Sequence, residues 1–166
     1  MATRYAEQTS VSVERSKAEI EAILDRYGAE AFQYGRNQDK AVIEFICRNR
    51  RVRFVLPLPR RDADEFTKTP TKQREVRPDQ ALSRWEQACR QRWRALALAI
   101  KAKLEAVSCG IATFDEEFLA HVVDPGTGLT IGETLTPRLE VAYAEHRSVL
   151  KLHQEPKRLK GPSVCD

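Results

Sequence analysis

The chain has 166 residues, of which 42% are hydrophobic, 31% charged and 7% aromatic. This length and composition predict one domain with its own core, and they exclude collagen-like, low-complexity and wholly disordered proteins. No run approaches the roughly 20 apolar residues of a membrane-spanning helix, and no apolar leader is visible near the first residues. We therefore expect a cytoplasmic protein that does not bind membranes.

The four cysteines, Cys47, Cys89, Cys109 and Cys165, form no CxxC pair. Without a secretory signal, free thiols in a reducing compartment are the simplest interpretation. Cys47 and Cys89 fall on apolar faces, so we expect both to pack in the core.

The net charge of +4 hides an uneven distribution along the chain. Residues 48–103 carry 16 Lys and Arg against 6 Asp and Glu, a net of +10. Residues 104–150 carry 2 against 8, a net of −6. A basic surface of this kind favours a polyanionic partner. The alternative is that the two segments face each other and cancel.

The first part of the chain predicts a helix followed by a three-stranded meander. The helix spans about residues 16–27, because Ser16 and Glu19 match a capping box and Gly28 suits a helix end. Apolar residues at helical spacing support it. Strands are expected over three runs rich in Val, Ile and aromatic residues: 31–36, 41–47 and 51–58, the last two joined by a tight turn at Arg48-Asn49.

The third strand alternates between apolar and basic residues. A period of two places Arg51 and Arg53 on the outer face of the sheet. The residues expected to face the core are Val52, Phe54, Leu56 and Leu58.

Residues 60–78 are expected to form a long, mobile, basic loop. The strongest periodic signal follows, because apolar residues recur every three or four positions from Leu82 to Val107. This spacing predicts an amphipathic helix of about 28 residues that packs on the sheet. Asp79 is placed to cap its start and Gly110 to end it.

Two short helices are expected after the long one. Thr113 and Glu116 form a capping box that opens the first. A glycine-rich turn over 124–132 leads to the second, which begins at Thr136-Pro137. The apolar residues assigned to the two helices are Phe114, Phe118, Leu119 and Val122, and then Leu139, Ala142 and Tyr143.

The fold class is therefore α+β, with the helices on one face of a three-stranded antiparallel sheet. A single domain is expected over residues 1–153. A disordered tail is expected over residues 154–166.

No motif for catalysis or cofactor binding emerges from the spacing of reactive residues. Glu117 and His121 share a helical face, as two metal ligands would. No third ligand is identifiable, and acidic residues in a first turn ordinarily complement the helix dipole. The Gly126-Thr127-Gly128 segment lacks the Gly-Lys-Ser/Thr ending of a P-loop. We expect no metal, no cofactor and no enzymatic activity.

The basic residues of the middle segment are the candidate site for nucleic acid, with phosphates as their partners. The alternative interpretations are a solvated helix face with local pairs, such as Glu86 with Arg90, or a surface for an acidic protein. The aromatic complement is limited to Phe32, Tyr34 and Phe66, so we expect charge to be read rather than base sequence. The candidate phosphate-binding residues are Arg51, Arg53, Arg60, Arg61, Lys72, Arg74, Arg90, Arg94 and Lys101.

Five short runs carry a resemblance to known proteins: VRFVLPLP at 52–59, RWRAL at 92–96, KAKL at 101–104, GIATF at 110–114 and FLAHV at 118–122. Over about residues 11–143 the chain resembles a family of small tailed-bacteriophage and prophage proteins of unknown activity. The resemblance implies the bacterial host cytoplasm as location, and it implies no activity, cofactor or catalytic residue.

Two functional hypotheses follow. The first is a non-enzymatic accessory protein that binds DNA or RNA by its backbone charge. The second is a small modulator or inhibitor of a host enzyme or defence complex, which it would bind through a sheet edge or the acidic helices after Gly110. An enzyme or nucleotide-sequestering protein, and a homo-oligomer, are left open.

Overall fold

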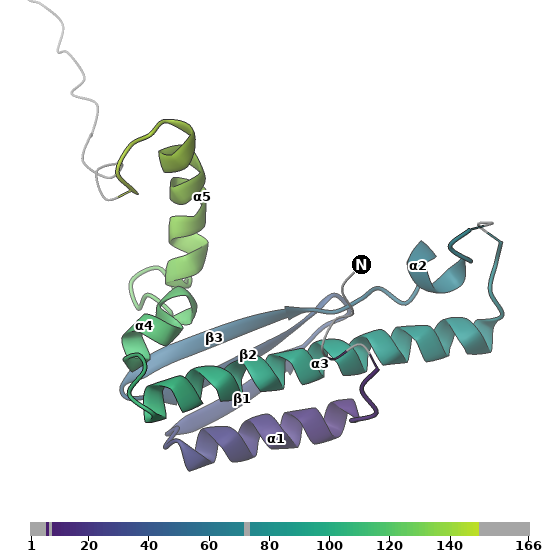
Figure 1. The fold of residues 1–166 in the computed structure, drawn as a ribbon, viewed down its shortest axis with the longest axis horizontal. Helices are drawn as coiled ribbons and strands as arrows, with labels where there is room; N and C mark the ends of the chain where they lie inside the picture. The colour runs from purple at the N-terminus through teal and green to yellow at the C-terminus, as the bar shows by residue number, and fades with distance from the viewer. Residues whose placement is uncertain (1–5, 7, 72–73, 150–166) are drawn as a thin grey trace, which may run out of the picture.

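The computed structural model describes residue 6, residues 8–71 and residues 74–149. The protein is an α+β fold, as expected, built on one antiparallel sheet in the order β1-β2-β3 (Figure 1). The elements in chain order are α1 (Val13–Arg26), β1 (Ala31–Arg36), β2 (Lys40–Cys47), β3 (Arg50–Pro57), α2 (Asp64–Thr67), α3 (Pro78–Ser108), α4 (Phe114–Phe118), the 3-10 helix η1 (Leu119–His121) and α5 (Ile131–Ala144).

The strands pair as the sequence predicts, and their apolar side chains lie on the predicted face of the sheet. Arg48 and Asn49 adopt φ values of 51° and 60°, which a two-residue hairpin turn requires. The register pairs Phe45 of β2 with Phe32 of β1 and Val52 of β3, so all three lie on one face. The inner residues of β3 confirm the alternation: Val52, Phe54 and Leu58 are buried and Leu56 packs against them.

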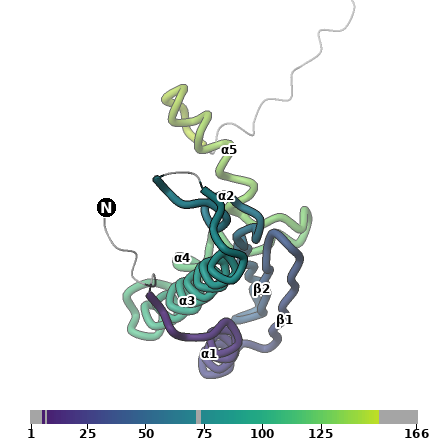
Figure 2. Tube along the Cα trace, turned by 90° about the vertical axis from the view of Figure 1, so that its right-hand side faces the viewer, coloured from purple at the N-terminus to yellow at the C-terminus, as the bar shows by residue number. Residues whose placement is uncertain are grey.

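Helices α1 and α3 cover this inner face and leave the other uncovered. A view along α3 shows both helices on one side of the strands (Figure 2). The apolar stripe of α3 supplies the centre of the core, and Cys47 and Cys89 are buried as expected. The core side chains of α1 and α3 include Ile20, Leu24, Trp93, Ala97, Ile100 and Leu104.

Helix α1 begins three residues before the expected start. The hydroxyl of Ser12 accepts the N–H of Arg15 at 3.1 Å and caps the helix. Ser16 is buried, and its hydroxyl donates to the Ser12 carbonyl at 3.1 Å. The predicted Ser16 capping box is therefore wrong, because Ser12 already closes the first turn. Gly28, with φ 78°, ends the helix as predicted.

Helix α3 has 31 residues, slightly more than expected. Pro78 occupies its first turn, where a missing N–H costs nothing. The prediction that Asp79 caps the helix is wrong. Its carboxylate instead accepts a hydrogen bond from the Arg77 guanidinium at 2.6 Å. Gly110, with φ 71°, follows the C-terminal end as predicted.

The segment 60–78 contains more regular structure than the expected loop. Helix α2 forms within it, and Phe66 is buried. Lys68 and Glu75 then form an isolated antiparallel bridge. The segment contacts α3 through helix α2 and through the hydrogen bond from Arg84 to the Lys68 carbonyl at 3.5 Å.

The C-terminal helices differ from the prediction in their bounds. The Thr113–Glu116 capping box is present, but α4 ends at Phe118 and η1 continues it, leaving Leu119 53% exposed. Thr130 and Glu133 form another capping box and start α5 at Ile131. The predicted start at Thr136-Pro137 is therefore wrong, because a stronger cap occurs one and a half turns earlier.

Helix α5 stands away from the body of the protein (Figure 1). Its first turn packs on η1, and Ala142 is buried. Of the three apolar residues assigned to this helix, Ala142 alone is buried, whereas Leu139 is 41% and Tyr143 80% exposed. The tail expected from residue 154 lies outside the described residues.

Within the described ranges, no helix has both the length and the apolar character that crossing a membrane requires.

The start of α5 offers a test of the packing. A Cβ at Gly132 would lie 2.7 Å from the carbonyl oxygen of Ala120. We expect Gly132→Ala to destabilise the protein by about 1–3 kcal/mol, because this backbone clash exceeds the gain of about 1 kcal/mol for Ala over Gly in a helix. Urea unfolding and amide exchange in α5 measure the effect.

Gly35→Ala is the matched control, since a Cβ at this strand residue meets nothing within 4 Å. Its effect should stay within about 0.5 kcal/mol. Equal effects of the two substitutions would contradict the proposed close approach of α5 to η1.

Candidate functional site

The structure separates the described residues that were expected to contact phosphates. Arg60, Arg61 and Arg90 lie together near the N-terminal half of α3. Five others lie elsewhere: Arg51 and Arg53 on the outer sheet face, Arg94 against α1, Lys101 farther along α3, and Arg74 beside Thr69. The ninth, Lys72, is outside the described residues.

The first group surrounds two adjoining hollows of about 260 and 460 Å³, which lie where α3 passes the ends of β1 and β3. Arg36 and Trp85 line both hollows. We call the two hollows together the arginine–tryptophan groove, bounded by Arg36, Arg60, Arg61, Trp85, Arg90 and Trp93.

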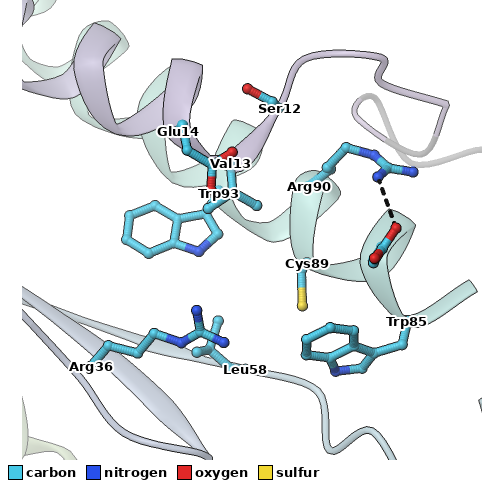
Figure 3. A pocket seen from close by; sticks show the side chains of 10 residues that line it. Ser12, Val13, Glu14, Arg36, Leu58, Trp85, Cys89, Arg90 and Trp93 are labelled. Atoms are coloured by element: carbon cyan, nitrogen blue, oxygen red, sulfur yellow. Dashed lines mark ion pairs between the residues drawn. The ribbon is translucent and has the colours of Figure 1, made fainter. Parts of the chain in front are cut away.

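The two tryptophans of the groove have different roles. Trp93 is only 2% exposed and packs edge-on against Tyr34, with ring centroids 5.6 Å apart. Trp85 is half-buried, and its indole N–H donates to the Pro59 carbonyl at 2.8 Å. Figure 3 shows both rings facing the hollow that Arg36 enters from the sheet side. Trp93 therefore belongs to the core, whereas Trp85 presents part of its ring to the groove.

The cations of the groove differ in how far they are neutralised. Arg60 pairs with Asp62 at 2.8 Å, and its hydrogen bond lowers the pKa of Asp62. Arg90 contacts the side chain of Gln87 at 2.7 Å and Glu86 at 3.9 Å.

Two groove arginines are not neutralised in this way. Arg61 lies over the ring of Trp85, 5.9 Å from its centroid. Among the described residues, neither Arg36 nor Arg61 has a carboxylate within ion-pair distance. They are the two groove cations available to an anionic ligand.

Arg51 and Arg53 form a different arrangement on the outer sheet face. Both contact the carboxylate of Glu44, which is 5% exposed and also accepts a hydrogen bond from Gln33. Burial raises the pKa of Glu44, but the hydrogen bonds from Arg51, Arg53 and Gln33 outweigh it and bring the pKa to about 2. Arg53 also donates to the Gly128 carbonyl at 2.8 Å, which holds the glycine-rich turn against the sheet. These arginines stabilise the fold, so we no longer count them as phosphate ligands.

The acidic residues and the histidine that follow α3 make structural contacts within the protein. Asp115 pairs with Arg50 at 3.2 Å and Glu117 with Lys103 at 3.2 Å. Glu116 caps α4, and His121 stacks on Phe54 with ring centroids 4.0 Å apart. In the part of the chain that the structure describes, no three His, Cys, Asp or Glu side chains gather as a metal ion would require.

Sequence reasoning missed two residues that define the groove. Arg36 follows Phe32 and Tyr34 at every second position of β1, so it belongs to the same inner face of the sheet. Its charge therefore lies on that face at the end of the strand. Trp85 lies on the apolar stripe of α3, so the periodicity predicted a core residue. The structure places it beyond the end of the sheet. Of the expected stacking residues, Phe66 is buried and Tyr34 packs on Trp93.

The Glu44 cluster gives a prediction about stability. We expect Glu44→Gln to lower the free energy of unfolding at pH 7 by about 2–3 kcal/mol, the value of a buried charge-assisted network. In the unfolded chain the carboxyl titrates near its usual pKa of 4.5. The stabilisation should therefore be complete above about pH 4.5 and lost as the pH falls toward 2. Urea unfolding of both proteins at pH 7, 4 and 3 measures this difference.

Glu86→Gln is the control, because Glu86 is half-exposed and its pair with Arg90 is long at 3.9 Å. A surface pair of this kind is worth less than about 1 kcal/mol. A stability loss in Glu44→Gln that does not shrink with falling pH would contradict the assignment.

Comparisons with protein-family models, with curated proteins and with solved structures each returned no match. The function proposed below is inferred from the residues and geometry of the groove.

Proposed function

We propose that the protein is a non-enzymatic accessory protein that binds nucleic acid, DNA or RNA, at the arginine–tryptophan groove. The observation that supports this most directly is that Arg36 and Arg61, two cations without carboxylate partners among the described residues, flank a half-buried tryptophan. Arginine binds phosphate oxygens in bidentate geometry, and tryptophan stacks on bases. The resemblance to small phage proteins agrees with a role in the cytoplasm of an infected bacterium.

Ion pairs limit how strongly charge contributes at five of the expected phosphate-binding residues, which are Arg51, Arg53, Arg60, Arg90 and Arg94. Each neutralised phosphate adds about 0.7–0.9 to the slope of log K against log salt. Nine contacts would give a slope of about −6 or steeper, whereas two to four groove contacts give about −1.4 to −3.6. We therefore expect affinity to fall roughly 7- to 150-fold between 50 and 200 mM salt, rather than several thousand-fold.

Fluorescence-anisotropy titration of labelled DNA and RNA at these two salt concentrations tests the proposal. Arg61→Gln should weaken binding several-fold at 50 mM salt and reduce the slope by about 0.7, because one phosphate contact is lost. Lys101→Gln makes the same change in net charge about 24 Å from Trp85 along α3, and it should leave the slope unchanged.

Equal effects of the two substitutions would indicate diffuse attraction to the whole surface and contradict a groove site. The absence of binding at 50 mM salt would remove the proposal altogether.

A second candidate function, the binding of a host protein, is favoured by helix α5. Leu139 and Tyr143, four residues apart on one face of this helix, are 41% and 80% exposed, and the helix stands clear of the body. Apolar side chains on one exposed face of a helix are typical of surfaces that bind another protein.

Affinity capture from bacterial lysate, with and without nuclease, separates the two functions. For the second function, partners should survive nuclease and be lost with the double substitution Leu139→Glu and Tyr143→Glu. Partners that disappear with nuclease would instead support the groove.

A further inference from the structure

We propose that the arginine–tryptophan groove binds an unpaired nucleobase with its flanking phosphates, so that the protein selects single strands over duplexes. The inference rests on the proposed function and names the form of nucleic acid that the groove takes. It also replaces the expectation that the protein recognises only the charge of the nucleic-acid backbone.

The charges of the groove are the first argument. Its four arginines are matched by four carboxylates in the same lining, those of Glu14, Asp39, Asp62 and Glu86. A groove with this balance does not create the strong positive field by which proteins hold duplex backbones. Binding here must therefore draw on contacts other than charge.

The aromatic surface is the second argument. The hydrogen bond from Trp85 to Pro59 fixes the indole, so little conformational entropy is lost when a ligand stacks on it. Trp93 and Leu58 line the same hollow, and because both are buried in the core they form a rigid support behind the Trp85 ring. Every nucleobase has a flat π-face, and each stacked base contributes affinity whatever its identity.

The positions of the two cations that have no ion-pair partner among the described residues are the third argument. Arg36 comes from the end of β1 and Arg61 from the segment before α2, and both line the hollow that Trp85 closes. A base that stacks on Trp85 would take the place of the Arg61 guanidinium, which lies over the ring in the free protein, and its flanking phosphates would then meet Arg36 and Arg61 in the same hollow. Figure 3 shows the Arg36 side chain in the adjoining smaller hollow, between Trp93 and Trp85.

A duplex does not satisfy these contacts. Its bases are paired and stacked on one another, so their faces are exposed only after flipping, at a cost of a few kcal/mol. A single strand can turn a base out at little cost. The groove geometry therefore points to unpaired nucleic acid, or to a free nucleotide with the same chemistry.

The intrinsic fluorescence of the protein reports directly on this site, because the chain has two tryptophans and both line the groove. The full-length protein is titrated with a 12-nucleotide oligo-dT, with a DNA hairpin duplex of equal phosphate number, and with thymidine 5′-monophosphate. We expect oligo-dT to quench the emission and to bind at least ten-fold more tightly than either of the other two.

Substitution of Trp85 isolates the stacking contact. Trp85→Ala should weaken oligo-dT binding by about ten-fold, the usual loss for one stacked base. Trp85→Phe should recover most of the affinity. Because neither variant can donate to Pro59, their difference measures the ring and not the hydrogen bond. Circular dichroism confirms folding, and the wild-type quenching comparison stands even where Trp85→Ala does not fold.

Each outcome bears on the proposal. Quenching by oligo-dT together with loss in Trp85→Ala and recovery in Trp85→Phe supports it. Salt-dependent binding without quenching, or equal quenching by the duplex, overturns it and leaves nucleic-acid binding in place. Monophosphate binding as tight as that of oligo-dT overturns the assignment to strands and identifies a nucleotide site. The absence of binding by all three probes overturns both this inference and the proposed function.

Discussion

The packing of α3 on the inner sheet face is the constraint on which the rest of the structure depends. A helix of 31 residues is about 46 Å long, whereas strands of 8 residues span about 26 Å. About 20 Å of helix therefore extends past the sheet and must bury its apolar stripe elsewhere. At the N-terminal end, Phe66 of α2 and the Pro59 segment meet the helix. At the C-terminal end, Phe114 and Phe118 of α4 do so.

The arginine–tryptophan groove is a direct result of this difference in length. Trp85 lies on the same helical stripe as Trp93, but it meets Pro59, which follows the end of β3 at Pro57. Its indole is held by a single hydrogen bond to the Pro59 carbonyl, and part of the ring stays open. The groove forms where the sheet ends and the helix continues, and α5 emerges at the opposite end of the molecule (Figure 1). The two candidate binding surfaces are therefore separated by the length of the core.

Tertiary ion pairs change what the charge distribution means. The basic segment pairs with acidic residues outside it, through Arg94 with Glu19, Arg50 with Asp115 and Lys103 with Glu117. Two further arginines share the buried carboxylate of Glu44. Both sequence alternatives, a polyanion-binding surface and mutual cancellation, are thus present in part. Nine of the described cations in residues 48–103 form ion pairs, and the others, Arg48, Arg61, Arg74, Arg84, Arg92 and Lys101, have no carboxylate of the described residues within ion-pair distance. The cations that line the groove, rather than the net charge of the segment, set the expected salt dependence.

Local patterns in the sequence determined the helices and strands and which face of each element lies toward the core. The alternation in β3, the Arg48-Asn49 turn, the Thr113 capping box and the period of α3 each involve residues close in the chain, so backbone geometry alone selects them. Where the sequence offered two possible N-terminal caps for one helix, the local pattern did not show which of them forms. Ser12 and Thr130 act as caps in place of Ser16 and Thr136, because helix starts depend on which turn also packs against a neighbour.

The candidate site was decided by tertiary structure. Arg36, Arg61 and Trp85 come from a strand end, a loop and a helix, and no spacing in the sequence relates them. Likewise, only the fold shows that Glu44 neutralises Arg51 and Arg53 while Arg36 and Arg61 have no such partner among the described residues. The sequence by itself determined which residues are basic, aromatic or apolar and which face of each element they occupy. Which of those charges remain available to a ligand depends on contacts between distant segments, and these exist only once the chain has folded.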